Sequence, residues 1–341
     1  MELSLPAMGE ARDLNARLTK PVGSLGVLED LGVRLAGIAG SCPPPPPEPA
    51  AVAVFAGDHG VVAQGVTPWP QEVTGQMVAT FCSGGAAVNA LADQVGARLV
   101  VVDVGVAGDL HPDPRLLDRK VARGTRDLAV GPAMSVEEAR AAWDVGATVA
   151  GDLVAGGARL LVTGDMGIGN TTPSAALVAV LAGGRPADCT GRGTGIDDAT
   201  LARKRAVVSA AVDRARPAVG PWEVLAGVGG LEIAALAGFV AAGARARVPV
   251  VVDGVVTLAA VLVAEAVEPG AVNACVAGHR STEPAASAAL EHLGLRPLLD
   301  LDLRLGEGSG ACLAVPLVQA AARLLREMST FDAAGVTEKQ T

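Results

Sequence analysis

Three glycine-rich turns carry the residues of this chain that could do chemistry. The first, Gly164-Asp165-Met166-Gly167-Ile168-Gly169-Asn170-Thr171-Thr172, lies between a predicted strand and a predicted helix. Its glycines at 164 and 169 have the spacing of a P-loop, but Asn170-Thr171 stands where that motif needs Lys-Ser/Thr. A helix N-terminus with free N–H groups still favours an anion, so the turn predicts a monophosphate site. A tight turn with Thr171 or Thr172 as a helix cap is the alternative.

The second turn is Gly191-Arg192-Gly193-Thr194-Gly195, and the helix predicted after it carries Arg203-Lys204-Arg205. Such a basic cluster could close over a phosphate through charge-assisted hydrogen bonds. A solvated basic face of a helix is the alternative.

The third turn, Gly306-Glu307-Gly308-Ser309-Gly310, presents one carboxylate between glycines, which lets it approach a ligand closely. A helix is predicted from Ser309, and its positive end is expected to keep Glu307 ionised. An ionised carboxylate is what a general base requires. The alternative is an ordinary glutamate at a helix start.

The elements that would position these turns alternate along the chain. Strands are predicted at residues 51–56, 98–104, 159–163, 248–253 and 271–277. Helices are predicted over 10–40 as one helical segment, and at 71–94, 135–155, 173–181, 198–215, 231–242, 255–267, 283–293 and 309–328. Nearly continuous apolar strands separated by helices predict an α/β fold, a parallel sheet covered by helices on both faces.

Charged or ionisable side chains follow every predicted strand. They are Asp58-His59, Asp103, Asp165, Asp253 and His279-Arg280. Ligands bind outside the carboxyl ends of the strands in an open parallel sheet, so the five loops together predict a site at one edge. Any single one of these aspartates could instead cap the next helix.

Composition excludes several functional classes. A net charge of −9 argues against general nucleic-acid binding, which needs clustered Lys and Arg. Five scattered cysteines without a CxxC pair suggest neither zinc nor a disulfide framework, and no metal-ligand cluster is evident. The first ten residues lack the apolar core of a signal peptide, and the uncharged stretch 166–184 contains polar residues that lipid disfavours. We therefore expect a cytoplasmic protein that does not associate with membranes.

Read in order, six segments resemble the nicotinate-nucleotide:dimethylbenzimidazole phosphoribosyltransferases. They are KPVGSLGVLE (20–29), GDHGV (57–61), VGPAMS (130–135), GIGNTTP (167–173), DG (253–254) and RLGEGSGA (304–311). The resemblance covers almost the whole chain. It implies a homodimer with a Rossmann-like large domain (50–304) and a small helical domain formed by 1–42 together with 305–341. The proline-rich run at 43–49 can form neither a helix nor a central strand, and it predicts a linker between the N-terminal helices and the large domain. The resemblance also implies that nicotinate mononucleotide and a benzimidazole-type base are the substrates, with no cofactor and no metal.

The family's functional residues map onto this chain through the matching motifs. The resemblance implies Glu307 as the catalytic base, with Asp165 and Lys204 lining the same site; some relatives carry Glu at 165, one methylene longer. The residues implied for phosphate and ribose are Gly167, Ile168, Gly169, Asn170, Thr171, Gly193 and Lys204. Those implied for the base pocket are Asp58, His59, Trp69, Pro70, Met77, Leu305 and Gly306.

Two rival functions compete with this interpretation. A nicotinamide-dependent dehydrogenase would need an intact GxGxxG followed about 20 residues later by an acid, and the chain has none. A non-catalytic nucleotide-binding protein could keep the fold, although Glu307 and the two other glycine turns argue against it. A phosphoribosyltransferase for a different aromatic acceptor is a third possibility.

Overall fold

The computed structural model describes residues 1–218 and 220–337, and it is built around one parallel sheet. The sheet has six strands in the order β3-β2-β1-β4-β5-β6. They are β1 (Ala50–Gly57), β2 (Arg98–Gly105), β3 (Leu116–Asp118), β4 (Leu160–Met166), β5 (Val250–Val252) and β6 (Cys275–Ala277). The order reverses between β1 and β4, so the carboxyl ends of these two strands flank the crevice in which such sheets bind ligands. The predicted α/β class is confirmed.

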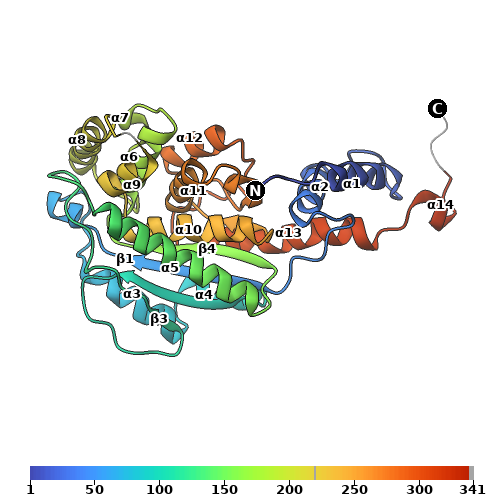
Figure 1. Ribbon diagram of the computed structural model, residues 1–341, viewed down its shortest axis with the longest axis horizontal. Helices are drawn as coiled ribbons and strands as arrows, with labels where there is room; N and C mark the ends of the chain where they lie inside the picture. The colour runs from blue at the N-terminus through green and yellow to red at the C-terminus, as the bar shows by residue number, and fades with distance from the viewer. Residues whose placement is uncertain (219, 338–341) are drawn as a thin grey trace.

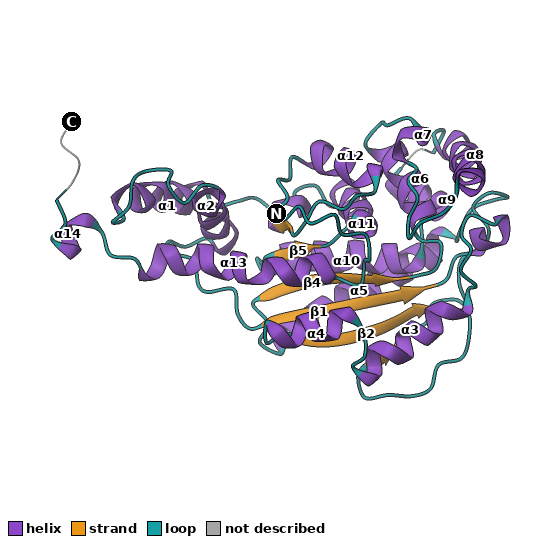
Figure 2. Cartoon of the chain, turned by 180° about the vertical axis from the view of Figure 1, so that it is seen from behind, coloured by secondary structure: helices purple, strands orange, loops and turns teal. Residues whose placement is uncertain are grey.

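Helices cover both faces of the sheet (Figures 1 and 2). One face holds α5 (Val136–Ala155), α6 (Thr171–Leu181), α7 (Pro186–Cys189), α8 (Asp198–Ala215), α9 (Pro221–Val228), α10 (Leu231–Arg245), α11 (Val255–Val267) and α12 (Pro284–Leu293). The other holds α3 (Glu72–Ser83), α4 (Ala87–Gln94) and α13 (Ser309–Glu327). Strand β1 divides its side chains between the two cores: Ala53 and Phe55 face the first, Val52 and Val54 the second. A strand buried on both sides explains the continuous apolar run in the sequence.

Small residues allow unusually close packing between α5 and α10. A Cβ added at Gly146 would lie 1.7 Å from the Ala235 carbonyl oxygen, and one at Gly238 would lie 2.0 Å from that of Trp143. The two helices are therefore in backbone contact, which suits a chain that is only 2% aromatic.

The two chain ends meet beside the sheet. Helices α1 (Leu5–Arg17) and α2 (Val27–Ala39) pack on the C-terminal part of α13, and α14 (Phe331–Ala334) follows it. A Cβ at Gly32 of α2 would lie 2.8 Å from Leu325 of α13. Figure 2 shows α13 running from the sheet to this helical group.

Several predicted elements differ from the structure. The segment predicted as one helix over 71–94 is broken at Gly84, whose φ of +87° ends α3. Residues predicted to begin the last strand form a 3-10 helix, η2 (Ala271–Ala274), before β6. The N-terminal segment is two helices, and it begins at Leu5 instead of Glu10. Strand β3, helix α9 and the short η1 (Gly60–Gln64) were not predicted, because each has eight residues or fewer and little periodicity.

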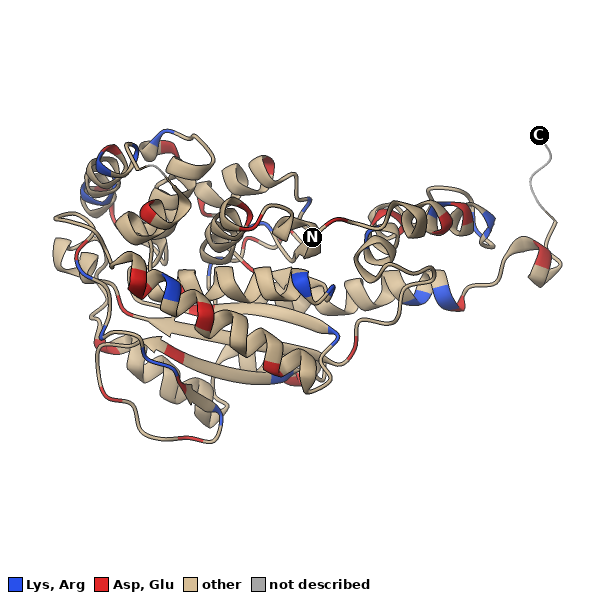
Figure 3. Ribbon diagram, in the orientation of Figure 1, with Lys and Arg blue, Asp and Glu red and all other residues tan. Residues whose placement is uncertain are grey.

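Charged residues are spread over the helices and loops of the chain (Figure 3). Along the ribbon of α5, Figure 3 marks several acidic residues and a basic one. Within residues 1–218 and 220–337, no helix is long and apolar enough to cross a membrane.

Candidate active site

The turn after β4 lies against the end of β1. A Cβ at Gly167 would lie 2.4 Å from the Gly57 carbonyl oxygen, so only glycine fits there. Gly169 has a φ of +87°, which also favours glycine. The Ile168 N–H donates to Thr74 Oγ1 of α3 over 3.1 Å. Together these contacts fix the turn and aim the N-terminus of α6 at the carboxyl edge of the sheet.

Asp165 is buried at the end of β4. Its Oδ2 accepts a hydrogen bond of 2.9 Å from Nδ2 of Asn170, the residue that precedes α6. Burial, together with the nearby charge of Asp253, raises the pKa of Asp165 to about 8. Its carboxyl group is therefore largely protonated at neutral pH and can donate a hydrogen bond.

Lys204 on α8 reaches the same turn. Its side chain is only 2% exposed, and Nζ donates to Thr171 Oγ1 (2.7 Å) and to the Gly191 carbonyl oxygen (3.1 Å). Burial lowers the pKa of this ammonium group. Arg203 and Arg205 are exposed, so these two arginines form the solvated basic face that was the alternative interpretation. Lys204 is buried and faces inward.

Glu283 holds the second glycine turn in place. Its Oε1 accepts from the Gly193 N–H over 2.7 Å, and a Cβ at Gly191 would lie 2.5 Å from that oxygen. Arg304 donates to the Gly193 carbonyl oxygen over 3.3 Å. The turn is therefore bound from two sides and lies over Lys204.

The two turns line one cleft of about 100 Å³. Trp69 stands across from the second turn and donates from Nε1 to Thr194 Oγ1 over 3.2 Å, although the residue is 50% exposed. Predicted site residues that line the cleft are Asp165, Gly167, Ile168, Gly169, Asn170, Thr171, Gly193, Lys204, Trp69 and Leu305. Ten of the predicted residues, distant in sequence, thus come together around one space.

Glu307 lies on the third turn, directly beside Asp165. A Cβ at Gly306 would lie 3.2 Å from Asp165 Oδ2, and one at Gly164 would lie 2.4 Å from the Glu307 carbonyl oxygen. Glu307 itself has a φ of +64°, a left-handed conformation that is strained for a glutamate. Backbone strain of this kind concentrates at functional sites.

The expected source of charge stabilisation for Glu307 was wrong. Its Oε2 accepts a hydrogen bond of 3.3 Å from the Val88 N–H in the first turn of α4, not from α13. Burial raises the pKa of Glu307; the Val88 N–H lowers it, and Asp253 raises it further. The carboxylate is therefore a stronger base than an exposed glutamate.

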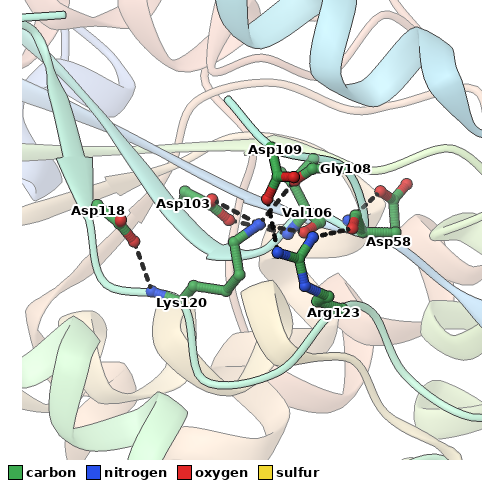
Figure 4. Close-up of polar contacts among 9 residues, drawn as sticks. Asp58, Asp103, Val106, Gly108, Asp109, Asp118, Lys120 and Arg123 are labelled. Atoms are coloured by element: carbon green, nitrogen blue, oxygen red, sulfur yellow. Dashed lines mark hydrogen bonds and ion pairs between the residues drawn. The ribbon is translucent and has the colours of Figure 1, made fainter. Parts of the chain in front are cut away.

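The remaining predicted base-pocket residues lie elsewhere. Asp58 Oδ2 accepts a hydrogen bond of 2.8 Å from the Ala107 N–H. Asp103, another acid at a strand end, holds the same turn: its Oδ1 accepts from the Val106 N–H over 2.8 Å, and its Oδ2 lies 3.0 Å from Lys120 Nζ. Figure 4 shows these side chains around the turn at 106–109. Asp58 also lines a separate cavity of about 730 Å³ between this turn and α3. Two of the four strand-end aspartates therefore hold a loop in place.

His59, Pro70 and Met77 do not line the cleft either. His59 is fully buried, with Nε2 2.8 Å from Glu232 Oε1. Pro70 is exposed ahead of α3, and Met77 packs against the core on the α3 side of the sheet. Among the described residues, no group of three or more His, Cys, Asp or Glu side chains is arranged to hold a metal ion.

Comparison with known proteins decides the family. A phosphoribosyltransferase family profile matches residues 2–336. The chain belongs to this phosphoribosyltransferase family. It is 60% identical to a nicotinate-nucleotide–dimethylbenzimidazole phosphoribosyltransferase of Salinispora tropica, over 98% of this chain and 96% of the relative. A relative of the same name from Chloroflexus aggregans is 53% identical, over 97% and 94%. These matches confirm the resemblance seen in the motifs.

Solved structures agree with the family assignment. The crystal structure of CobT from Thermus thermophilus superposes with a TM-score of 0.95 at 50% sequence identity, covering 98% of this chain and all of that one. The fold of that structure therefore extends over 98% of this chain.

Two buried acids of this phosphoribosyltransferase were missed by reasoning from the sequence. Glu283 precedes Pro284 at the start of α12, and Glu232 lies in the first turn of the otherwise apolar α10. An acid at the start of a helix is usually explained by its interaction with the helix dipole. The sequence therefore provides no reason to expect that Glu232 contacts His59 or that Glu283 contacts Gly193. A full helical pattern with one charge on its buried side is the signal that could have revealed Glu232.

Proposed function

We propose that this phosphoribosyltransferase moves the phosphoribosyl group of nicotinate mononucleotide onto 5,6-dimethylbenzimidazole or a related base. The products are nicotinate and α-ribazole 5'-phosphate, with inversion at the anomeric carbon. The observation that carries the proposal is the contact between the Glu307 turn and Asp165, next to the cleft formed by the two other glycine turns. The names of the relatives support the choice of substrates.

The phosphate occupies the cleft between the first two turns. The N-terminus of α6 supplies backbone N–H groups and the positive end of a helix dipole. Lys204, already bonded to Thr171, adds the positive charge. Asn170 and the protonated Asp165 lie where the ribose follows, and both can donate hydrogen bonds to its oxygens.

Glu307 acts as the general base. The free ring nitrogen of the acceptor attacks the anomeric carbon, and the bond to nicotinate breaks with its electron pair going to the pyridine nitrogen. That nitrogen is cationic in the donor and neutral after departure, so no general acid is needed. The acceptor's other ring N–H becomes acidic as the new bond forms, and Glu307 takes this proton. Base catalysis contributes about 10²–10⁴-fold in rate, and alignment of the reactants about 7–11 kcal/mol.

The assembly is part of the proposal. We infer a homodimer, as the resemblance to the family implies, with a small helical domain formed by 1–42 and 305–341, in which α1 and α2 pack on α13. No cofactor takes part, since the leaving group already carries the charge that drives its departure. Size-exclusion chromatography with light scattering tests the dimer.

Product analysis tests the activity. The protein is incubated with nicotinate mononucleotide and a panel of benzimidazoles, adenine and phenols, and the products are identified by mass and by the anomeric NMR signal. We expect α-ribazole 5'-phosphate with dimethylbenzimidazole, and a rate about 10²–10⁴-fold lower for Glu307→Gln at unchanged thermal stability. Tight binding of the mononucleotide without product would favour a non-catalytic protein, and wild-type turnover by Glu307→Gln would remove the base role.

A further inference from the structure

A buried pair of side chains lies behind the Glu307 turn, and the proposed mechanism does not use it. Asp253 follows β5 and is 0% exposed; His279 follows β6 and is 2% exposed. His279 Nε2 lies 3.4 Å from Asp253 Oδ1. The same carboxylate oxygen accepts the Ala311 N–H of α13 over 2.8 Å. One acid therefore connects the imidazole with the first turn of the helix that follows Glu307.

Packing makes this connection stiff. A Cβ at Gly310 would lie 2.0 Å from His279 Cδ2, so the imidazole ring lies directly on the backbone three residues after Glu307. A Cβ at Gly308 would lie 2.8 Å from the Thr163 carbonyl oxygen. Thr163 Oγ1 in turn accepts the Asp253 N–H over 3.2 Å. The Glu307 turn is therefore held between β4 on one side and the Asp253–His279 pair on the other.

The hydrogen bonds of the pair are incomplete. Asp253 Oδ2 and His279 Nδ1 are buried and have no hydrogen-bond partner in the described part of the chain. A purely structural ion pair usually satisfies its remaining lone pairs and protons, because leaving them unmet is costly. Retaining this pair in the core points to a use for its charge.

The charges around Glu307 come from few groups. Asp165 on β4 is largely protonated at neutral pH, whereas the negative charge of Asp253 after β5 acts to raise the pKa of both Asp165 and Glu307. Burial lowers the pKa of His279, but the hydrogen bond and charge of Asp253 raise it overall, so the imidazole is cationic in mildly acidic solution. Helix α4 presents its backbone N-terminus at Val88. On α13, burial and Asp253 raise the pKa of Cys312 to about 12, so that thiol is neutral.

We propose that Asp253 and His279 are a positioning pair for the base, which fixes the Glu307 turn and places two opposite charges behind it. The proposal rests on the base role given to Glu307. Asp253 makes the carboxylate harder to ionise, and the His279 cation moderates that effect. The two members of the pair therefore act on Glu307 in opposite directions.

The pH dependence of kcat/KM tests the pair. On the acid side of the profile, kcat/KM should fall as Glu307 becomes protonated, and we call this part the acid limb. Asp253→Asn keeps an oxygen for the Ala311 N–H but removes the negative charge, so the acid limb should move to lower pH. His279→Gln keeps a donor near the Nε2 position but leaves Asp253 without its cation, so the limb should move to higher pH. We expect shifts of about 0.5–1 pH unit in each direction, and a double variant close to wild type. Asp103→Asn is the matched control, a buried strand-end acid that pairs with Lys120 instead, and its limb should stay in place.

The outcomes separate this proposal from the base role itself. Glu307→Gln should abolish the acid limb. If that variant keeps the wild-type rate and the wild-type acid limb, Glu307 is not the base, and the proposed role of the Asp253–His279 pair is refuted as well. If Glu307→Gln behaves as expected but both pair variants leave the limb unmoved or shift it in the same direction, the pair is structural only. If Asp253→Asn does not fold, the upward shift in His279→Gln alone decides, and its absence overturns the proposal.

Discussion

Asn170 Nδ2 lies 2.9 Å from Asp165 Oδ2, which joins the acid near the end of β4 to the residue that precedes α6. Through this hydrogen bond, the turn proposed to hold the phosphate also orients the carboxyl group of Asp165 in the proposed ribose site. Because Gly306 approaches the same carboxyl group, Asp165 links the first glycine turn, to which it belongs, with the third.

Asp165 should make stability depend on pH. Its pKa is raised from its ordinary value to about 8, so its contribution to the free energy of unfolding is complete at low pH and is lost as pH rises toward and through 8. Asp165→Asn stays neutral at every pH and lacks this loss. Melting temperatures measured from pH 5 to 9 should therefore fall more steeply for wild type than for Asp165→Asn, and level off above pH 8. Asp188→Asn, at an exposed acid, should follow wild type. Parallel curves for wild type and Asp165→Asn would contradict the raised pKa.

Lys204 should act mainly on binding of the mononucleotide. Replacing it with Met removes the buried charge that contacts Thr171 and the Gly191 carbonyl oxygen. A charged hydrogen bond is worth about 1.5–3 kcal/mol, so kcat/KM should fall roughly 10- to 100-fold, mostly through KM for the mononucleotide. Steady-state kinetics with Arg205→Met as the control should show less than a twofold change, because Arg205 is exposed. Equal losses in both variants would mean that the effect is one of general surface charge.

The sequence predicts well what depends on local pattern. Short apolar runs that alternate with segments of helical periodicity predict the parallel sheet. Each glycine-rich turn can be recognised from a few consecutive residues. The partners of those turns could not be predicted in this way. Glu283 is separated by 90 residues from Gly193, and Glu232 by 173 residues from His59, so only the packing of α10 and α12 brings them into contact.

The charge state of Glu307 shows a second limit. Proximity in sequence pointed to α13, whereas its carboxylate reaches the N-terminus of α4, 219 residues away in the chain. The backbone direction at Glu307 depends on its left-handed conformation, which no local propensity of glutamate favours. Desolvation, the main cause of its raised pKa, likewise depends on the assembled fold.

Gly164→Ala should damage the site through packing alone. The added methyl group would lie 2.4 Å from the Glu307 carbonyl oxygen and 2.9 Å from Val54 Cγ2, and neither neighbour has room to move. Overpacking of this kind costs about 1–3 kcal/mol, and it should also displace the Glu307 turn and lower kcat. Gly151→Ala on α5, where nothing lies within 4 Å of the new methyl group, is the control and should keep or raise the melting temperature. Chemical unfolding together with kcat measures both effects, and a stable, fully active Gly164→Ala would show that the turn adjusts freely.

The buried His59–Glu232 pair packs against Gly167 of the first glycine turn and should hold that turn in place. Burial lowers the pKa of His59, but the charge and hydrogen bond of Glu232 raise it overall, so the imidazole is cationic below neutral pH. The stabilisation from this raised pKa is complete below about pH 6.5 and is lost as pH rises through the folded-state value. Glu232→Gln leaves the buried cation without its counter-charge, which should cost about 3–5 kcal/mol at pH 6 and clearly less at pH 9.

Urea unfolding of wild type and Glu232→Gln at the two pH values measures this difference directly. Gly167 lies against His59, since an added Cβ would be 3.1 Å from Nε2, so the same variant should raise KM for the mononucleotide by loosening the turn. Glu223→Gln, at an exposed acid in the first turn of α9, is the control for an acid near a helix start. A destabilisation of Glu232→Gln that is equal at both pH values would show that His59 is neutral in the folded protein and that the pair is an ordinary hydrogen bond.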